Sequence, residues 1–143
     1  MMLRAVAMAA ACLAALLACD ASAQIDPDDT GAGTKLGLTQ LDNSGQVGTV
    51  TLFAHGLHHT LVILDVQSVP AGQREPARIR RGHFCRTVPL HLIPAVALND
   101  VAAGASRSEV AVATGTLLSG NYLVEVFGSR HGPRRVTCGR LYR

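Results

Sequence analysis

The sequence predicts an all-β domain folded as an antiparallel Greek-key β-sandwich. About seven short segments alternate apolar and polar residues with the two-residue period of a strand, and turn residues separate them. No long segment follows the 3.6-residue period of an amphipathic helix. The chain has no tryptophan, three phenylalanines and two tyrosines, so its core has to consist of aliphatic side chains. This composition suits one compact domain and offers few rings for base stacking, so we expect no nucleic-acid partner.

The expected strands lie between clear turn signals. Alternation begins at Lys35 and stops at the Asp-Asn-Ser-Gly turn of residues 42–45. One helical turn at most is expected over residues 114–120. Between residues 82 and 106, prolines and a glycine interrupt the pattern, which predicts a long irregular excursion. The further expected strands are 47–54, 59–69, 76–81, 108–113, 122–127 and 135–141.

Residues 1–23 have the three parts of a secretory signal peptide. Arg4 precedes an apolar run over 5–18, and Ala21-Ser22-Ala23 forms a small-residue cleavage site. The run is shorter than the roughly 20 residues that span a bilayer, so no membrane span is expected; the alternative is a first core helix. We therefore expect a flexible arm over 24–34, a domain over 35–143 and a periplasmic or secreted location.

A second way of processing the leader stays open. The residues Leu16-Leu17-Ala18-Cys19 also resemble a bacterial lipoprotein box. In that case Cys19 carries a lipid anchor, and the product is a membrane-anchored lipoprotein.

Two cysteines remain after the leader is removed. Cys85 and Cys138 admit a single internal pairing, and an oxidising compartment favours a disulfide over the alternative of two free buried thiols. On the loop-entropy model, closing a loop of this length lowers the entropy of the unfolded chain and so stabilises the folded protein by about 4 kcal/mol.

The histidines give a weak indication of a metal site. His55, His58 and His59 lie around one expected turn and would converge there, or they form an ordinary polar surface. His83 and His91 lie within the expected excursion, and nothing in their spacing requires a common ligand.

Other catalytic patterns are not evident. The sequence has no nucleophile elbow and no glycine-rich phosphate loop between a strand and a helix. Asp65 and Glu125 lie in the middle of expected strands, and alternation predicts that both face solvent. The formal net charge of +3 is mild and selects no class of partner.

Several motifs in order resemble the copper/zinc superoxide dismutase-like and CHRD-like β-sandwich family. These motifs are Gly45-Gln46-Val47-Gly48-Thr49-Val50-Thr51-Leu52, Val66 through Ala71-Gly72, Pro76-Ala77-Arg78-Ile79-Arg80-Arg81-Gly82 with Cys85, Leu98-Asn99-Asp100-Val101, Leu117-Leu118-Ser119-Gly120-Asn121-Tyr122, and Cys138-Gly139. The resemblance extends from about Lys35 to the end of the chain. It implies the Greek-key sandwich and the Cys85–Cys138 pairing. It also places Arg135 where the dismutases carry an arginine that attracts superoxide.

The resemblance fails at the expected metal ligands. Two histidines separated by one residue are expected on one strand, and Arg78 and Arg80 stand in their places. Phe127 takes the place of a further histidine. Arginine stays protonated and cannot coordinate a cation. We therefore expect no cofactor and no catalytic residues. The alternative is a metal-binding or weakly dismutase-like protein that holds copper or zinc with relocated histidines.

The same substitutions create a candidate anion-binding site. Arg78 and Arg80 project from the same face of a strand, and the resemblance brings Arg135 close to them. Together they could hold a carboxylate, a phosphate or a sulfated glycan, or they form a solvated edge strand that discourages aggregation. The expected function is an exported non-catalytic protein that binds an anionic ligand or an envelope protein, or that has a structural role there.

Overall fold

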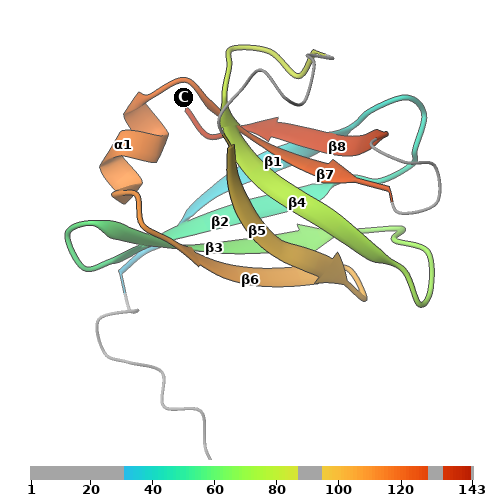
Figure 1. Cartoon of the computed structure of the whole chain (residues 1–143), viewed down its shortest axis with the longest axis horizontal. Coiled ribbons are helices and arrows are strands. Elements are labelled where there is room, and N and C mark those ends of the chain that lie inside the picture. The colour runs from blue at the N-terminus through green and yellow to red at the C-terminus, as the bar shows by residue number, and fades with distance from the viewer. Residues whose placement is uncertain (1–30, 87–94, 129–133, 143) are drawn as a thin grey trace, which may run out of the picture.

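Eight antiparallel strands and one short helix make up the computed structural model, which describes residues 31–86, 95–128 and 134–142 (Figure 1). The strands close into a barrel in the order β1-β2-β3-β6-β5-β4-β7-β8. The elements are β1 (Thr34–Gln40), β2 (Gly48–His55), β3 (His59–Val66), β4 (Arg74–Arg81), β5 (Ala95–Ala102), β6 (Ala105–Val110), α1 (Thr114–Ser119), β7 (Tyr122–Phe127) and β8 (Arg135–Arg140).

The all-β class is confirmed. The expected sandwich of two separate sheets is not observed, because the hydrogen bonds join all eight strands into one closed barrel. Long ladders build the halves β1-β2-β3-β6 and β5-β4-β7-β8. At one seam β1 pairs with β8 through Thr39↔Cys138 and Gln40↔Thr137. At the other seam β5 and β6 pair through Ala102↔Ala105. These short ladders join the two halves into a closed barrel, although most residues of β1 and β5 have no ladder partner across the two seams.

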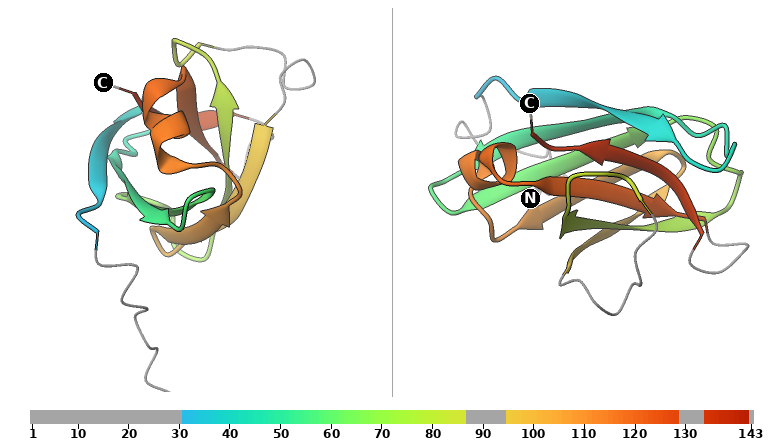
Figure 2. Two further views of the ribbon diagram at one scale, coloured as in Figure 1. Left: turned by 90° about the vertical axis from the view of Figure 1, so that its left-hand side faces the viewer. Right: turned by 90° about the horizontal axis from the view of Figure 1, so that it is seen from above.

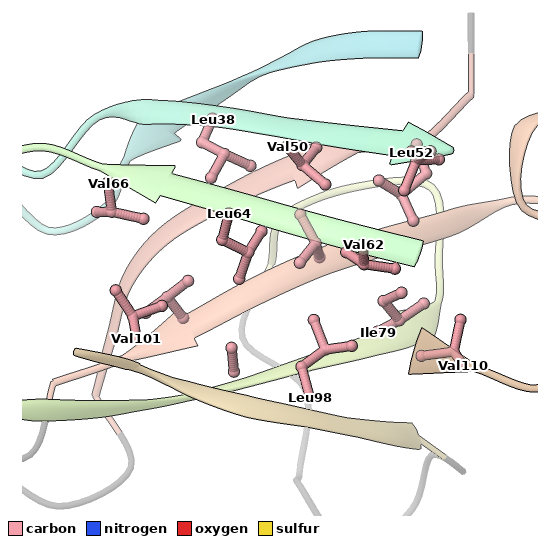
Figure 3. Packing of buried hydrophobic residues seen from close by; sticks show 14 of the residues in the cluster. Leu38, Val50, Leu52, Val62, Leu64, Val66, Ile79, Leu98, Val101 and Val110 are labelled. Carbon is pink, nitrogen blue, oxygen red and sulfur yellow. The ribbon is translucent and has the colours of Figure 1, made fainter. Parts of the chain in front are cut away.

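The barrel interior is filled by aliphatic side chains, as the composition predicted (Figure 3). Val50 and Leu52 of β2 face Val62 and Leu64 of β3, and all four are fully buried or nearly so. Strand alternation explains the pattern, because every second side chain of a strand points to the same side of the sheet. At one end of the barrel, α1 buries Leu117 (Figure 2).

Strand β5 was missed, because residues 82–106 were expected to be irregular. Its buried side chains, Leu98 and Val101, are three residues apart rather than two. A register shift between Glu75 and Ala77 of β4 causes this spacing, since Glu75 pairs with Val101 but Ala77 pairs with Leu98. The extra residue of such a bulge breaks the two-residue period that identifies a strand in a sequence. Pro76 lies at this point, where its missing N–H costs no ladder hydrogen bond.

Gly48 begins β2 at a place where two backbones approach closely. A Cβ added to it would overlap the carbonyl oxygen of Asp65 on the neighbouring strand. Gly37 on β1, by contrast, has open space where its Cβ would lie.

The disulfide between Cys85 and Cys138 is present, with its sulfur atoms 2.06 Å apart. It confirms the expected pairing and indicates a location outside the reducing cytoplasm. Within the described ranges, no helix has the length and the apolar character needed to cross a membrane. The expected signal peptide, Cys19 and all but the last residues of the expected arm lie outside the described residues, and β1 begins at Thr34, one residue earlier than expected.

Candidate functional site

The candidate site lies on the outer face of the barrel, across β4, β7 and β8. Antiparallel pairing sets Arg78 of β4 beside Glu125 of β7, and Glu125 beside Cys138 of β8. In the adjacent row on this face, Arg80 pairs with Leu123. Because residues two apart share a face, the alternation that buries Val124 and Val126 in the core points Glu125 the other way.

Glu125 is the centre of an arginine–glutamate cluster that comprises Arg78, Arg80, Arg135 and Glu125. The guanidinium of Arg78 donates from Nε and Nη2 to Oε2 of Glu125, at 3.1 and 2.9 Å. Oε1 of Glu125 lies 2.8 Å from Nη2 of Arg80 and 2.6 Å from Nη1 of Arg135. The glutamate side chain is fully buried, while 2%, 8% and 15% of the Arg80, Arg135 and Arg78 side chains are exposed. One carboxylate is thus the counter-ion of three guanidiniums in a site that is almost fully buried.

These contacts set the charge state of Glu125. Burial by itself raises the pKa of a carboxyl group, because it removes water from the ionised form. Against this, hydrogen bonds from Arg80, Arg135 and Arg78 hold the pKa of Glu125 below its ordinary value. The carboxylate is therefore ionised at neutral pH, and the cluster has a net charge of about +2.

The last residue of β4 and the segment that follows it supply further acceptors, and this segment covers the cluster. Arg80 donates to the carbonyl oxygens of Arg81 and Arg86, at 3.1 and 3.2 Å. Arg135 also donates to the carbonyl oxygen of Arg86. Cys85 lies within this segment, and its disulfide to Cys138 ties the segment to β8, directly beside Glu125. The disulfide therefore holds in place the carbonyl groups that the buried guanidiniums need.

The three candidate anion-binding residues are brought together, but the anion that they contact belongs to the chain. Arg78, Arg80 and Arg135 were expected to lie close together, and no exposed edge strand is formed there because β4 pairs with both β5 and β7. The expectation that Glu125 faces solvent was wrong, because the disulfide-linked segment covers the outer face at that point. Asp65 is exposed as expected.

An arginine–aromatic surface, formed by Phe84, Arg86, Arg140 and Tyr142, borders the cluster. Phe84 is 54% exposed, and the guanidiniums of Arg86 and Arg140 lie 5.2 and 5.4 Å from its ring centroid. Arg140 also lies 6.0 Å from the ring of Tyr142, and the Tyr142 hydroxyl donates to the His83 carbonyl at 2.7 Å. This surface was not predicted, although the expected Cys85–Cys138 disulfide, which joins residues 53 positions apart, was a signal for it.

The candidate histidines do not assemble into a metal site in the described part of the chain. His55 and His59 are paired across the β2–β3 hairpin, and Nδ1 of His55 lies 3.3 Å from Oε1 of Glu109. His58 lies exposed in the hairpin turn, and His83 lies exposed after β4. His91 is outside the described residues. Among the described residues, no three His, Cys, Asp or Glu side chains are grouped as metal ligands.

The outer-face cluster does not fit a copper ion. Arg78 and Arg80, at the two expected ligand positions, carry permanent positive charges and are directed at Glu125. Phe127, at the third, has its ring 4.9 Å below the guanidinium of Arg78. A divalent cation in this place would lie among three guanidiniums, with one carboxylate that is already saturated by hydrogen bonds.

No family model, curated protein or solved structure matches this chain.

Proposed function

We propose that this protein is an exported, non-catalytic binding protein that takes an anionic ligand on its arginine-rich outer face. In this proposal the domain is a Greek-key relative of the copper/zinc superoxide dismutase-like sandwiches, and an arginine–glutamate cluster replaces the metal centre. Strand order supports the relationship. β4, β5 and β6 are consecutive neighbours and β7 returns to lie beside β4, which is the Greek-key order.

The observation that carries the proposal is the engagement of Glu125 by three arginines. A guanidinium cannot ligate a metal, and here three of them use the only carboxylate of the cluster as their counter-ion. The site has therefore exchanged the ligands of a cation for groups that hold an anion. Its inner anion position is filled by Glu125, so an external ligand has to bind at the exposed rim.

Arg86 and Arg140 provide that rim. Both side chains are exposed, and both lie against the ring of Phe84. Stacking on an aromatic ring restricts a guanidinium, so less conformational entropy is lost when it binds a ligand. The excess charge of the buried cluster beneath adds to the positive potential of this face. Sulfate, phosphate and carboxylate groups are the ligands that paired guanidiniums recognise.

Retention on a heparin column at low salt tests the proposal. We expect the double variant Arg86→Ala/Arg140→Ala to elute at a clearly lower salt concentration than the wild type, because it loses two exposed cations and their stacking platform. The variant Arg107→Ala removes one exposed arginine of β6, on the other half of the barrel, and serves as the matched control. Each single variant, Arg86→Ala and Arg140→Ala, should elute earlier than Arg107→Ala. Equal elution of these three single variants would show that only net charge matters and would contradict a defined binding face.

A further inference from the structure

A second polar site lies at the end of the barrel opposite α1. The start of β4 and the end of β7 lie at that end (Figure 1). A cavity of about 300 Å³ is found there. Its wall includes Ser44, Gln46, Glu75, Gly128 and Arg134. None of these residues belongs to the arginine–glutamate cluster or to the arginine–aromatic surface, so this site is independent of the proposed anion binding.

Glu75 is the unusual group of this cavity. It is 1% exposed, and Oε1 accepts a hydrogen bond from Nε2 of Gln46 at 2.7 Å. Its other oxygen, Oε2, has no hydrogen-bond partner among the described residues, and neither has Oε1 of the buried Gln46. A buried carboxylate needs a donor or a counter-charge, since leaving it without one is costly. The amide nitrogen of Gln73, which lines the same cavity, makes no hydrogen bond to either oxygen, so both acceptors stay open to a donor that enters the cavity.

Among the described residues that line the cavity, the only cation is engaged by another carboxylate. Arg134 lines the cavity, but its Nη2 donates to the carbonyl oxygen of Asp42 at 2.5 Å and its Nε lies 3.8 Å from Oδ2 of Asp42. The bulge between Glu75 and Ala77 lies directly at the site. Bulges are common beside binding sites, where they redirect a side chain.

We propose that this cavity binds the ammonium group of a small primary amine, with Glu75 Oε2 and Gln46 Oε1 as its acceptors. An ammonium has three donors and no acceptor, and it stays charged at neutral pH. A calcium ion fits less well, because it takes six to eight oxygen ligands, and the described residues contain no cluster of three potential metal-ligating side chains. The volume is at the lower end of the range for ligand pockets, which suits a small molecule.

The test is an NMR titration of the full-length processed protein with ethanolamine, observed at the side-chain amide of Gln46. Ethylene glycol is the matched probe that lacks the ammonium. We expect a saturable shift of the Gln46 resonances with ethanolamine and none with ethylene glycol. In the variant Glu75→Gln, which keeps the side-chain size, the dissociation constant should rise at least about tenfold. The variant Glu109→Gln removes an exposed carboxylate of β6 and should bind as the wild type does.

Three results would overturn the proposal. They are the absence of a saturable shift with ethanolamine, the same shift with calcium chloride or ethylene glycol, and unchanged affinity in Glu75→Gln. If that variant does not fold, the comparison of the three probes on the wild-type protein still decides the matter.

Discussion

Replacing Glu125 by glutamine should destabilise the protein strongly, because it removes the counter-charge of three arginines. Glu125 is fully buried, and Arg80 and Arg135 are nearly buried. Their guanidiniums therefore cannot reach solvent unless the disulfide-linked segment moves away. Removing one partner of a buried ion pair costs about 3–5 kcal/mol. At roughly 4 °C per kcal/mol for a domain of this size, Tm should fall by about 12–20 °C.

The loss of stability in Glu125→Gln should depend on pH. The pKa of Glu125 is lower in the folded protein than its ordinary value of 4.5. The stabilisation that its charge provides is therefore complete above that ordinary value and is lost as the pH falls through the lower folded-state pKa. The difference in unfolding free energy between wild type and Glu125→Gln should be constant near neutral pH and should narrow in acid below about pH 4.5.

Urea unfolding of the disulfide-bonded wild type and variant, repeated from neutral to acid pH, measures the loss of unfolding free energy and its change with pH. Glu109→Gln is the control, because the exposed pair of Glu109 with His55 should contribute less than about 1 kcal/mol. If Glu125→Gln unfolds within about 1 kcal/mol of wild type at neutral pH, or if its deficit does not narrow in acid, the cluster is not held together by this carboxylate.

Two further predictions concern the packing of β2 against β3 and the disulfide that covers the site. In thermal unfolding, Gly48→Ala should destabilise the protein by more than about 1 kcal/mol, because the added Cβ would overlap the Asp65 carbonyl. The control Gly37→Ala should be nearly as stable as the wild type, since its Cβ would enter open space. Equal melting temperatures of the two variants would contradict the close approach of β2 and β3. The double variant Cys85→Ser/Cys138→Ser should have a free energy of unfolding about 2–5 kcal/mol lower than the wild type in urea. Combining it with Glu125→Gln should lower the free energy of unfolding by less than the sum of the two separate losses, because both changes loosen the segment over the cluster. Strict additivity would show that the disulfide and the cluster are independent.

The sequence predicted the parts of the fold that obey a regular period. β2, β3, β7 and β8 were expected close to their observed bounds, because core residues such as Val62 and Leu64 alternate with outward ones. β5 was missed, since the bulge opposite Pro76 separates Leu98 from Val101 by three residues.

The candidate site was predicted only in part. The spacing of Arg78 and Arg80 placed them on one face, and the resemblance added Arg135. Alternation also placed Glu125 on the outer face. What covers that face depends on a disulfide between distant residues, and a strand period contains no information on such a cover. The contact of Phe84 with Arg140 did have a signal in the sequence, because the expected Cys85–Cys138 pairing brings their two segments together, but the contact was not predicted from it.

We propose that guanidinium groups stand where the sandwiches that this chain resembles hold a metal ion. Elemental analysis of the protein without residues 1–23, purified after exposure to copper and zinc and then dialysed, tests this proposal most directly. The account predicts that neither metal is retained in stoichiometric amount. One tightly held copper or zinc ion per chain would contradict it.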